Sequence, residues 1–321
     1  MAFYPLSNRV KNFRDVLEAT EIQLQESNVH CGHGYESPHD EAVALVLAAA
    51  QLPITTGSEI LEKNVPDDVL ERLATYLERR TLAREPTAYI IGKSWLGPLM
   101  FKADKRALIP RSPLREVIET GFSPWWQGSD QGSKQGGGRG KQVAEPRCIV
   151  DVCCGGGSLG LLAAWAFPHA DVLLLDIDQD ALALASENRA QHALANATLQ
   201  QADLLSSVAE NTADIILANP PYVDADDMAA LPQEYLHEPS LALAAGNDGL
   251  DLVHTLMRQA ALSLTHGGML FLEVGNSWPA LEQSYPNFPF TWLTFDCGGH
   301  GVCVLSKSEL NSLFGSTLSP A

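Results

Sequence analysis

The sequence predicts an α/β protein, in which a doubly wound, mostly parallel sheet follows a small helical domain. From residue 147 onward, short apolar strand patterns alternate with helical patterns, which is typical of parallel strands joined by crossover helices. The first 92 residues show only helical periodicity. The length of 321 residues fits about two domains of ~150 residues each.

The helical domain is predicted over residues 1–92. Apolar residues recur at helical spacing over 9–29, 38–51 and 66–84. The third segment starts with Pro66 and two aspartates and has arginines near its other end, as the first helical turn and the helix dipole prefer. We therefore expect three helices in this domain.

A linking region and a loop follow. Residues 94–110 read as a short β-hairpin and 113–122 as a helix, so 93–126 joins the two domains. Residues 127–145 are rich in Gly, Ser and Gln, which predicts a flexible loop. Arg139 is its one arginine, too few for a nucleic-acid-binding Gly/Arg tract.

The second domain is predicted over 146–306, with a C-terminal tail over 307–321. Its strands and helices alternate, and its last two strands are expected to pair antiparallel. The predicted strands are 148–153, 171–175, 198–201, 214–218, 268–274, 290–295 and 301–305, and the predicted helices are 158–167, 180–192 and 250–264. In such sheets, ligands bind beyond the carboxyl ends of the strands.

The charge is acidic and uneven. The chain has 39 Asp and Glu against 21 Lys and Arg, a net charge of −18. Residues 142–321 hold 21 of the acids and 4 of the bases, while residues 1–115 are nearly balanced, with 15 and 14. This balance argues against a protein that coats nucleic acid, which needs clustered cations, and suits a basic partner.

Other classes are disfavoured as well. No apolar run approaches the ~18–20 residues of a membrane span, and the first ten residues lack the apolar core of a signal peptide. The six cysteines form no C-x-x-C pair, which favours reduced thiols in a cytoplasmic protein. His30-Cys31-Gly32-His33 has no second ligand pair, so no metal site is expected.

A glycine-rich turn is the first candidate site. The strand that carries Asp151 runs through Cys153 into a turn with Gly155 and Gly157, and a helix follows. Glycines let the backbone approach a ligand closely. A carboxylate at Asp151 suits a cationic or amine-bearing ligand better than a pyrophosphate. A plain structural turn is the alternative.

Acidic residues follow the next two strands. Asp176, followed by Ile177, is placed to hydrogen-bond both hydroxyls of a ribose. Asp203, followed by Leu204, would offer an acceptor to an adenine amino group. Solvated loop acids are the alternative for both, and a dinucleotide enzyme would share the first feature.

The strongest signal is Asn219-Pro220-Pro221-Tyr222, directly after a buried strand. The two prolines end the strand and stiffen the turn, which leaves Asn219 in the binding crevice. The Asn219 side-chain carbonyl and the Pro220 backbone carbonyl are two convergent acceptors, and Tyr222 adds an aromatic face. This combination fits a planar –NH₂ group.

An Asn-Pro-Pro-Tyr motif after such a Rossmann-like start resembles the class I S-adenosylmethionine-dependent methyltransferases that act on planar amino groups. These include DNA adenine-N6 enzymes and protein glutamine-N5 enzymes. Residues 222–239 and 246–250, with the helical domain and hairpin, are similar to the glutamine branch. A DNA enzyme would carry a target-recognition domain and a basic face; neither is visible, so no direct DNA binding is expected.

Within the glutamine branch, two groups compete. Release-factor methyltransferases have a Pro-Arg-Pro-x-Thr-Glu stretch before the catalytic domain, whereas residues 109–116 read Ile-Pro-Arg-Ser-Pro-Leu-Arg-Glu. That stretch, with 273–277 and 289–293, resembles the PrmB-type ribosomal-protein glutamine methyltransferases, which modify large-subunit ribosomal protein three. A release-factor enzyme and a non-catalytic ribosome-assembly binding module remain the alternatives.

The resemblance implies S-adenosylmethionine as cofactor and a basic ribosomal protein as substrate, with the helical domain recognising the substrate. The implied catalytic residues are Asn219, Pro220 and Tyr222. The implied cofactor contacts are Asp151, Cys153, Gly155, Gly157, Asp176, Ile177, Asp203, Leu204 and Asn219. The implied substrate contacts are Asn219, Pro220, Pro221 and Tyr222, with Glu238 as a further candidate whose role its spacing does not fix.

Overall fold

The computed structural model describes residues 11–128, 144–246 and 248–315. The chain divides into two compact units. The N-terminal unit comprises Met1–Ser94, Ala103–Lys105 and Leu231–His237, and the sheet unit comprises Trp95–Lys102, Arg106–Ala230 and Glu238–Ala321. The segment Leu231–His237 therefore groups with the helices, although its position in the sequence lies inside the predicted catalytic domain.

The N-terminal unit is helical. Its helices are α1 (Phe13–Glu26), α2 (Pro38–Ala49), α3 (Asp67–Thr81) and α4 (Thr87–Ile91), with a 3-10 turn η2 (Ser58–Ile60). The side chains of Asn12 and Ser37 cap α1 and α2 by accepting bonds from backbone N–H groups, as residues of this kind do at helix starts. Leu24, Leu45 and Leu73 lie in its buried core. The three predicted helices are confirmed, and α4 is additional.

The predicted hairpin is confirmed but shorter. Its strands β1 (Lys93–Leu96) and β2 (Leu99–Lys102) form a two-stranded sheet, whereas the sequence pattern suggested that the hairpin continues to residue 110. The apolar residues that extended the pattern, Ala107 and Ile109, are buried without being in a strand. The predicted linking helix is α5 (Leu114–Glu119). Most of the loop predicted at 127–145 lies outside the described residues.

The sheet unit contains a seven-stranded sheet in the order β5-β4-β3-β6-β7-β9-β8. Strands β3 to β7 are parallel, β9 runs antiparallel to β7, and β8 runs antiparallel to β9. The bounds are β3 (Cys148–Val152), β4 (Asp171–Asp176), β5 (Ala197–Gln201), β6 (Ala213–Ala218), β7 (Leu264–Glu273), β8 (Thr291–Trp292) and β9 (Val302–Ser306). The predicted doubly wound, Rossmann-like α/β fold with its antiparallel final pair is confirmed.

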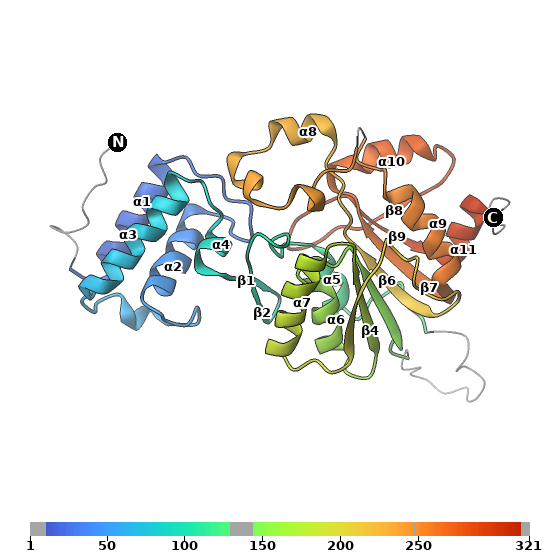
Figure 1. Ribbon diagram of the computed structural model, residues 1–321, viewed down its shortest axis with the longest axis horizontal. Helices are drawn as coiled ribbons and strands as arrows, with labels where there is room; N and C mark the ends of the chain where they lie inside the picture. The colour runs from blue at the N-terminus through green and yellow to red at the C-terminus, as the bar shows by residue number, and fades with distance from the viewer. Residues whose placement is uncertain (1–10, 129–143, 247, 316–321) are drawn as a thin grey trace. The chain divides into compact units, whose positions relative to one another are not determined.

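Helices cover both faces of this sheet (Figure 1). One face packs on α5 and on α6 (Ser158–Ala166), next to which lies α7 (Gln179–Gln191). The other face packs on α9 (Val253–Ser263), α10 (Trp278–Ser284) and α11 (Lys307–Phe314). Neighbouring residues of β6, such as Ile215 and Ile216, belong to opposite faces, which explains why the strand is apolar from Ile215 onward.

The end of the chain differs from the prediction. Residues 307–321 were expected to be a tail, but α11 occupies the first part of that range. Ser306 and Glu309 form a reciprocal capping box at its start, and Leu310 and Phe314 are buried against the sheet. A cap followed by an apolar pair four residues apart is a helix signal that the prediction overlooked.

Short elements complete the sheet unit and the excursion of the chain into the N-terminal unit. They are α8 (Ala225–Ala230), η4 (Gln233–His237), η5 (Ser240–Ala242) and η6 (Gly275–Ser277). Within the part of the chain that the structure describes, no helix has the length and apolar character needed to cross a bilayer, and no cluster of His, Cys, Asp and Glu could hold a metal ion.

Candidate active site

The sheet register brings the predicted site residues to one edge of the sheet, the one formed by the carboxyl ends of the parallel strands. Val152 of β3 pairs with Leu175 of β4 and with Ala218 of β6, so the residues that follow each of them emerge at the same level. Strand order reverses at β3, which lies between β4 and β6, and this switch point is where open α/β sheets form their ligand crevice. Cys153, Asp176 and Asn219 start from this edge.

The glycine-rich turn connects β3 to α6 through positive backbone angles. φ is 58° at Cys153, 53° at Gly155 and 83° at Gly157, and glycine tolerates such values best. A Cβ on Gly157 would lie 3.0 Å from the side chains of Ala185 and Leu174, so glycine is also needed there for packing. The turn is thus a tight backbone loop whose path depends on its glycines.

Asn188 of α7 supports this turn from behind. Its side-chain amide is fully buried, donates to the Gly156 carbonyl at 3.0 Å and accepts from the Lys102 N–H at 2.7 Å. No local pattern predicts a role for this residue, because a lone Asn in a helix carries no functional signal. The turn is therefore held by a neighbouring helix before any ligand binds.

Asp151 lies deeper than expected. Its side chain is only 1% exposed, and it accepts a 2.7 Å hydrogen bond from the Gly160 N–H in the first turns of α6. Burial raises the pKa of Asp151 to about 7, although the Gly160 bond lowers it. The expectation that Asp151 is presented to a ligand amine needs correction, because the carboxylate faces the helix and fixes the turn.

Asp176 is an accessible acid of the crevice. It is half-buried, and its two oxygens accept from the Gly155 N–H at 2.8 Å and the Asp178 N–H at 2.9 Å. A carboxylate has about four acceptor positions, so capacity remains for a pair of hydroxyls. Burial raises the pKa of Asp176, while the backbone bonds lower it.

The remaining predicted cofactor residues follow β4 and β5. Ile177 is exposed by 54%, Asp203 is exposed, and Leu204 is buried. Burial is the main cause that raises the pKa of the Cys153 thiol, and the charges of Asp176, Asp151 and Asp203 add to it. Asp151 and Asp176 lie at or near the carboxyl ends of the paired strands β3 and β4, so the structure brings these two predicted acids to the same end of the sheet.

Asn219 and Pro220 lie directly after β6. Asn219 is half-buried and Pro220 is buried. Among the described residues, no protein group hydrogen-bonds the Asn219 side chain or the Pro220 carbonyl. We call the Asn219 side-chain carbonyl and the Pro220 backbone carbonyl the acceptor pair. A half-buried amide without an internal partner is available to an external one.

Tyr222 is held at three points. Its hydroxyl donates to Glu273 Oε1 at 3.0 Å, and its backbone carbonyl accepts from the Ser277 hydroxyl at 2.8 Å. Its ring lies against Gly275, where a Cβ would approach Tyr222 Cε2 to 2.4 Å. Any side chain at Gly275 would displace the ring. The half-buried Tyr222 side chain is therefore held by residues of the sheet unit, two positions after Pro220 in the chain.

Glu273 was not predicted as a site residue. It ends β7 and is 6% exposed, and its second oxygen accepts from the Ser112 hydroxyl at 2.5 Å. Burial raises its pKa, opposed by the bonds from Ser112 and Tyr222. The signal was present: an acid at the carboxyl end of the strand beside β6, in the stretch 273–277 that carried part of the family resemblance.

Glu238, the further candidate substrate contact, is engaged inside the sheet unit. It is 5% exposed. Its oxygens accept two bonds from the Arg111 guanidinium, at 2.7 and 2.8 Å, and one from the Ile109 N–H at 2.9 Å. A bidentate pair of this kind is strong and directional. Glu238 thus positions the segment before α5. The structure does not support the prediction that Glu238 contacts the substrate directly.

The donor set fits S-adenosylmethionine. The crevice combines a tight glycine turn with Asp176 and Asp203, and among the described residues no Lys or Arg pairs with either acid. A pyrophosphate would be repelled by this charge, whereas a sulfonium cation with ribose hydroxyls and an adenine amino group is complementary. Asp176 would hold the ribose, Asp203 the adenine, and the glycine turn the methionine part.

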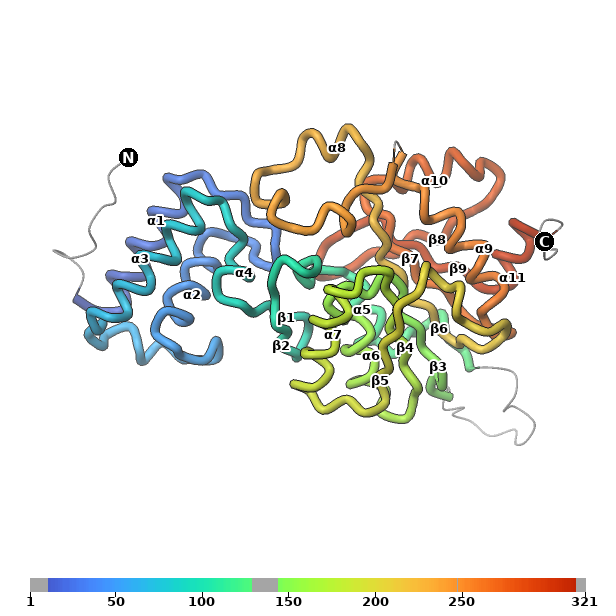
Figure 2. The backbone as a smooth tube through the Cα atoms, viewed as in Figure 1, coloured from blue at the N-terminus to red at the C-terminus, as the bar shows by residue number. Residues whose placement is uncertain are grey.

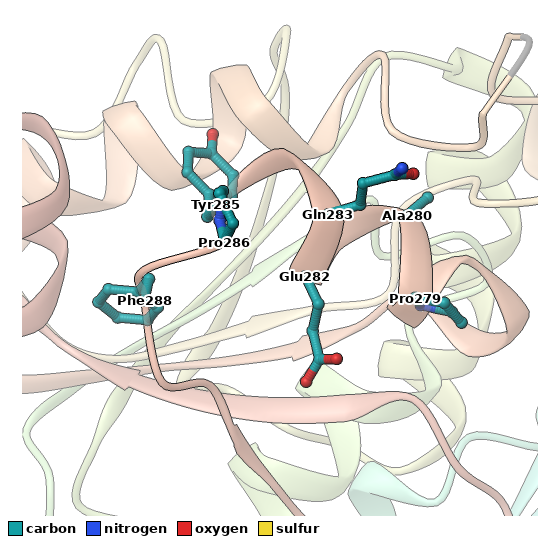
Figure 3. A pocket seen from close by; sticks show the side chains of 7 residues that line it. All are labelled: Pro279, Ala280, Glu282, Gln283, Tyr285, Pro286 and Phe288. Atoms are coloured by element: carbon teal, nitrogen blue, oxygen red, sulfur yellow. The ribbon is translucent and has the colours of Figure 1, made fainter.

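A surface pocket lies elsewhere, along α10 (Figure 3). Its lining residues are Pro279, Ala280, Glu282, Gln283, Tyr285, Pro286 and Phe288. None of them belongs to the predicted site, and the Glu282 carboxylate already accepts a 2.9 Å bond from the Trp292 indole. This pocket is therefore not part of the candidate active site.

Two family models match the chain. Residues 141–247 match the methyltransferase small domain, and residues 16–92 match the PrmC N-terminal domain. The first covers the glycine turn and the Asn-Pro-Pro-Tyr motif, and the second covers the helices of the N-terminal unit.

Curated relatives match almost the whole chain, and three of them are named ribosomal protein uL3 glutamine methyltransferase. The protein of Francisella tularensis is 36% identical over 94% of this chain and 92% of its own length. That of Xanthomonas campestris is 38% identical over 92% and 91%, and that of Bordetella pertussis is 35% identical over 94% and 97%. With this identity over nearly the full length of both chains, the protein belongs to the family of ribosomal protein uL3 glutamine methyltransferases.

Proposed function

We propose that the protein transfers a methyl group from S-adenosylmethionine to the side-chain amide nitrogen of a glutamine in ribosomal protein uL3. The observation that carries this proposal is the acceptor pair, which follows β6 directly and has no internal hydrogen-bond partner among the described residues. The names of the relatives support the choice of glutamine and of uL3.

The acceptor pair addresses the central difficulty of the reaction. An amide nitrogen is a poor nucleophile because its lone pair is delocalised into the carbonyl, and it is not deprotonated at neutral pH. Holding both of its N–H groups on Asn219 and Pro220 aligns the nitrogen with the methyl group, and such positioning is worth ~7–11 kcal/mol. The same two carbonyls stabilise the positive charge that develops on nitrogen, and the proton leaves after transfer.

The cofactor, when bound, supplies a methyl group on positively charged sulfur. The residues of the crevice then have separate tasks: Asp176 orients the ribose, Asp203 accepts from the adenine, and the glycine turn fixes the methionine part. Asp151 acts through its bond to Gly160, which keeps the turn in place. Glu273, which accepts a bond from Ser112, holds the Tyr222 hydroxyl.

The charge distribution suits the proposed substrate. Most of the acidic excess, 21 Asp and Glu against 4 Lys and Arg, lies in residues 142–321, and ribosomal proteins are basic. Long-range attraction would therefore speed their encounter. We further propose a cytoplasmic protein that does not bind DNA directly.

A labelling experiment tests the proposal. The protein is incubated with methyl-labelled S-adenosylmethionine and either purified uL3, a release factor or DNA, and the labelled residue is located by mass spectrometry. We expect label on a uL3 glutamine side chain and on neither of the other substrates. Label on the release factor would favour the release-factor group, label on adenine would refute the proposal, and uL3 binding without transfer would indicate an assembly module.

A further inference from the structure

Between the acceptor pair and Glu238, the chain leaves the sheet unit and returns to it. We call this segment, residues 223–237, the excursion. After Tyr222 it passes through α8, then through Leu231–His237, which belong to the N-terminal unit, and it re-enters the sheet unit at Glu238. The tube in Figure 2 follows this course through α8. The sheet unit holds both ends: Val223 exchanges backbone bonds with Leu243 and Ala245, at 2.9 and 3.0 Å, and Arg111 binds Glu238.

Glu234 fixes the middle of the excursion. Its side chain is 1% exposed, and its Oε1 lies 3.1 Å from Arg80 Nη1 and 3.0 Å from Arg84 Nε. The same oxygen accepts from the His30 N–H at 3.0 Å. Burial works against ionisation of Glu234, but these bonds and the arginine charges lower its pKa.

Arg80 connects Glu234 to the helices of the N-terminal unit. It is fully buried in α3 and binds Glu41 of α2 through two bonds, at 2.6 and 3.0 Å. It also donates to the His30 carbonyl at 2.8 Å. Two arginines thus meet two carboxylates, so the cluster of Arg80, Arg84, Glu41 and Glu234 is electrically balanced.

The first half of the excursion has few attachments of its own. No residue of α8 is buried, and the side-chain bond that it receives from Asn276, at Asp227, is exposed. In contrast, Tyr235 packs on His33 with ring centroids 4.3 Å apart, and His237 lies 2.8 Å from the Ala83 carbonyl. The course of residues 223–230 therefore depends on where its two ends are held.

Glu234 lies 154 residues beyond Arg80 in the chain, so this ion pair ties a distant segment to the helical domain. A buried ion pair is often no more stabilising than apolar residues of the same size, and its best-attested use is to fix one arrangement among several. Resting on the proposed function, we infer that Glu234 is a positioning residue, which anchors the excursion in the N-terminal unit and thereby keeps the segment after Tyr222 in the arrangement that presents the acceptor pair to the substrate amide.

Glu234→Gln tests this role, and Glu41→Gln is its matched control. Both variants remove one buried carboxylate from Arg80, but Glu41 belongs to α2 and leaves the excursion attached. The readouts are hydrogen exchange of the amides of residues 223–230, thermal unfolding, affinity for S-adenosylmethionine, and kcat and KM for uL3.

We expect both variants to unfold at lower temperature. In Glu234→Gln, exchange over 223–230 rises at least about tenfold and kcat falls about tenfold with an unchanged cofactor affinity, because the acceptor pair loses its alignment. Glu41→Gln keeps the wild-type exchange over 223–230 and the wild-type kcat below its unfolding temperature. Unchanged exchange in Glu234→Gln, or an equal loss of kcat in both variants, would overturn the inference.

Arg84→Gln provides a second variant should Glu234→Gln fail to fold. Arg84 is 20% exposed, so removing its charge weakens the Glu234 anchor with less damage to the core, and the same exchange and kcat changes are expected on a smaller scale. Exchange over 223–230 is measured without substrate. Therefore, if the wild-type protein methylates no glutamine, the proposed function fails, while the exchange data still decide whether Glu234 anchors the excursion.

Discussion

The two units of the molecule bury charged side chains in different parts of their structure. The N-terminal unit places Arg80, Glu41 and Glu234 among its helices, at 0%, 2% and 0% exposure. In the sheet unit, the strand centres are apolar, and buried acids such as Asp151 and Glu273 lie at or near the carboxyl ends of the strands.

This difference separates the residues that fix the fold from the residues that lie near the candidate site. The polar cluster of the N-terminal unit is charge-balanced, and of its carboxylate oxygens only Glu234 Oε2 lacks a hydrogen-bond partner. The cluster therefore fixes an arrangement of segments. The polar groups of the sheet unit lie at or near the carboxyl ends of β3 and β7, the strands that flank β6, and the acceptor pair that follows β6 has no internal partner among the described residues. We therefore expect substitutions in the cluster to affect unfolding first, and substitutions at the edge to affect catalysis first.

Arg80→Met should have the largest effect. It leaves Glu41 and Glu234 buried without their main cation, and breaking a buried pair in this way costs about 3–5 kcal/mol. We expect the N-terminal unit to unfold at a clearly lower temperature in calorimetry, while affinity for S-adenosylmethionine is unchanged because the candidate cofactor residues all lie in the sheet unit.

Arg14→Met is the control for Arg80→Met. Arg14 pairs with Glu62 in the same unit, but their side chains are 50% and 71% exposed, and exposed pairs contribute little. We expect no measurable shift in unfolding. A similar loss in both variants would mean that the buried cluster has no special structural role.

Asp151→Asn should change how stability depends on pH. The pKa of Asp151 is raised from 3.8 to about 7 in the folded protein, so the folded state keeps a proton that the unfolded state releases near pH 4. The resulting stabilisation is complete below about pH 4 and is lost as pH rises to 7, by at most about 4 kcal/mol. Denaturant unfolding at several pH values should show this loss in the wild type relative to Asp151→Asn.

The exposed Asp171 provides the comparison for this pH effect. Asp171→Asn should give a stability profile parallel to that of the wild type between pH 4 and 7, because Asp171 is in contact with solvent. If Asp151→Asn is parallel to the wild type as well, the carboxylate is not the buried support of the glycine turn that we describe.

Tyr222→Phe should have a moderate effect on catalysis. It removes the bond to Glu273 but keeps the aromatic ring, so we expect kcat to fall about tenfold, or about 1.4 kcal/mol, with cofactor affinity unchanged. Tyr285→Phe removes a hydroxyl that lies 2.9 Å from His254 Nδ1, away from the candidate site residues, and should leave kcat at the wild-type value. Equal losses in the two variants would indicate a general effect of removing tyrosine hydroxyls.

Salt should have the smallest effect. If the acidic sheet unit attracts a basic substrate, kcat/KM for uL3 should fall several-fold between ~0.05 and ~0.5 M salt as screening increases. The cofactor Kd, measured in parallel, separates steering of the protein substrate from effects on cofactor binding. A flat salt profile for uL3 would remove the steering argument.

Most of the sheet and the location of the site follow from local patterns. The apolar strands, the glycine turn and the prolines after Asn219 are signals contained in a few adjacent residues, and the parallel order of the strands brings their carboxyl ends together. Asp176, Asn219 and Tyr222 accordingly lie where the sequence indicates.

What the sequence did not reveal depends on pairs that are distant along the chain. Glu273 meets Ser112 and Tyr222 across 161 and 51 residues, and Glu234 meets Arg80 across 154. Glu238 looked like a candidate for substrate contact because its partner, Arg111, is 127 residues away. A single sequence contains no local trace of such partners, so buried acids are easily mistaken for ligand contacts.

The most direct test of the central claim is Asn219→Ala, examined by methyl transfer to uL3 and by binding of S-adenosylmethionine in the same preparation. Losing one of the two acceptors should lower kcat by about 10²–10³-fold, while the cofactor Kd and the unfolding temperature remain close to those of the wild type. Retained transfer, or a parallel loss of cofactor binding, would contradict the assignment of Asn219 as the residue that holds the substrate amide.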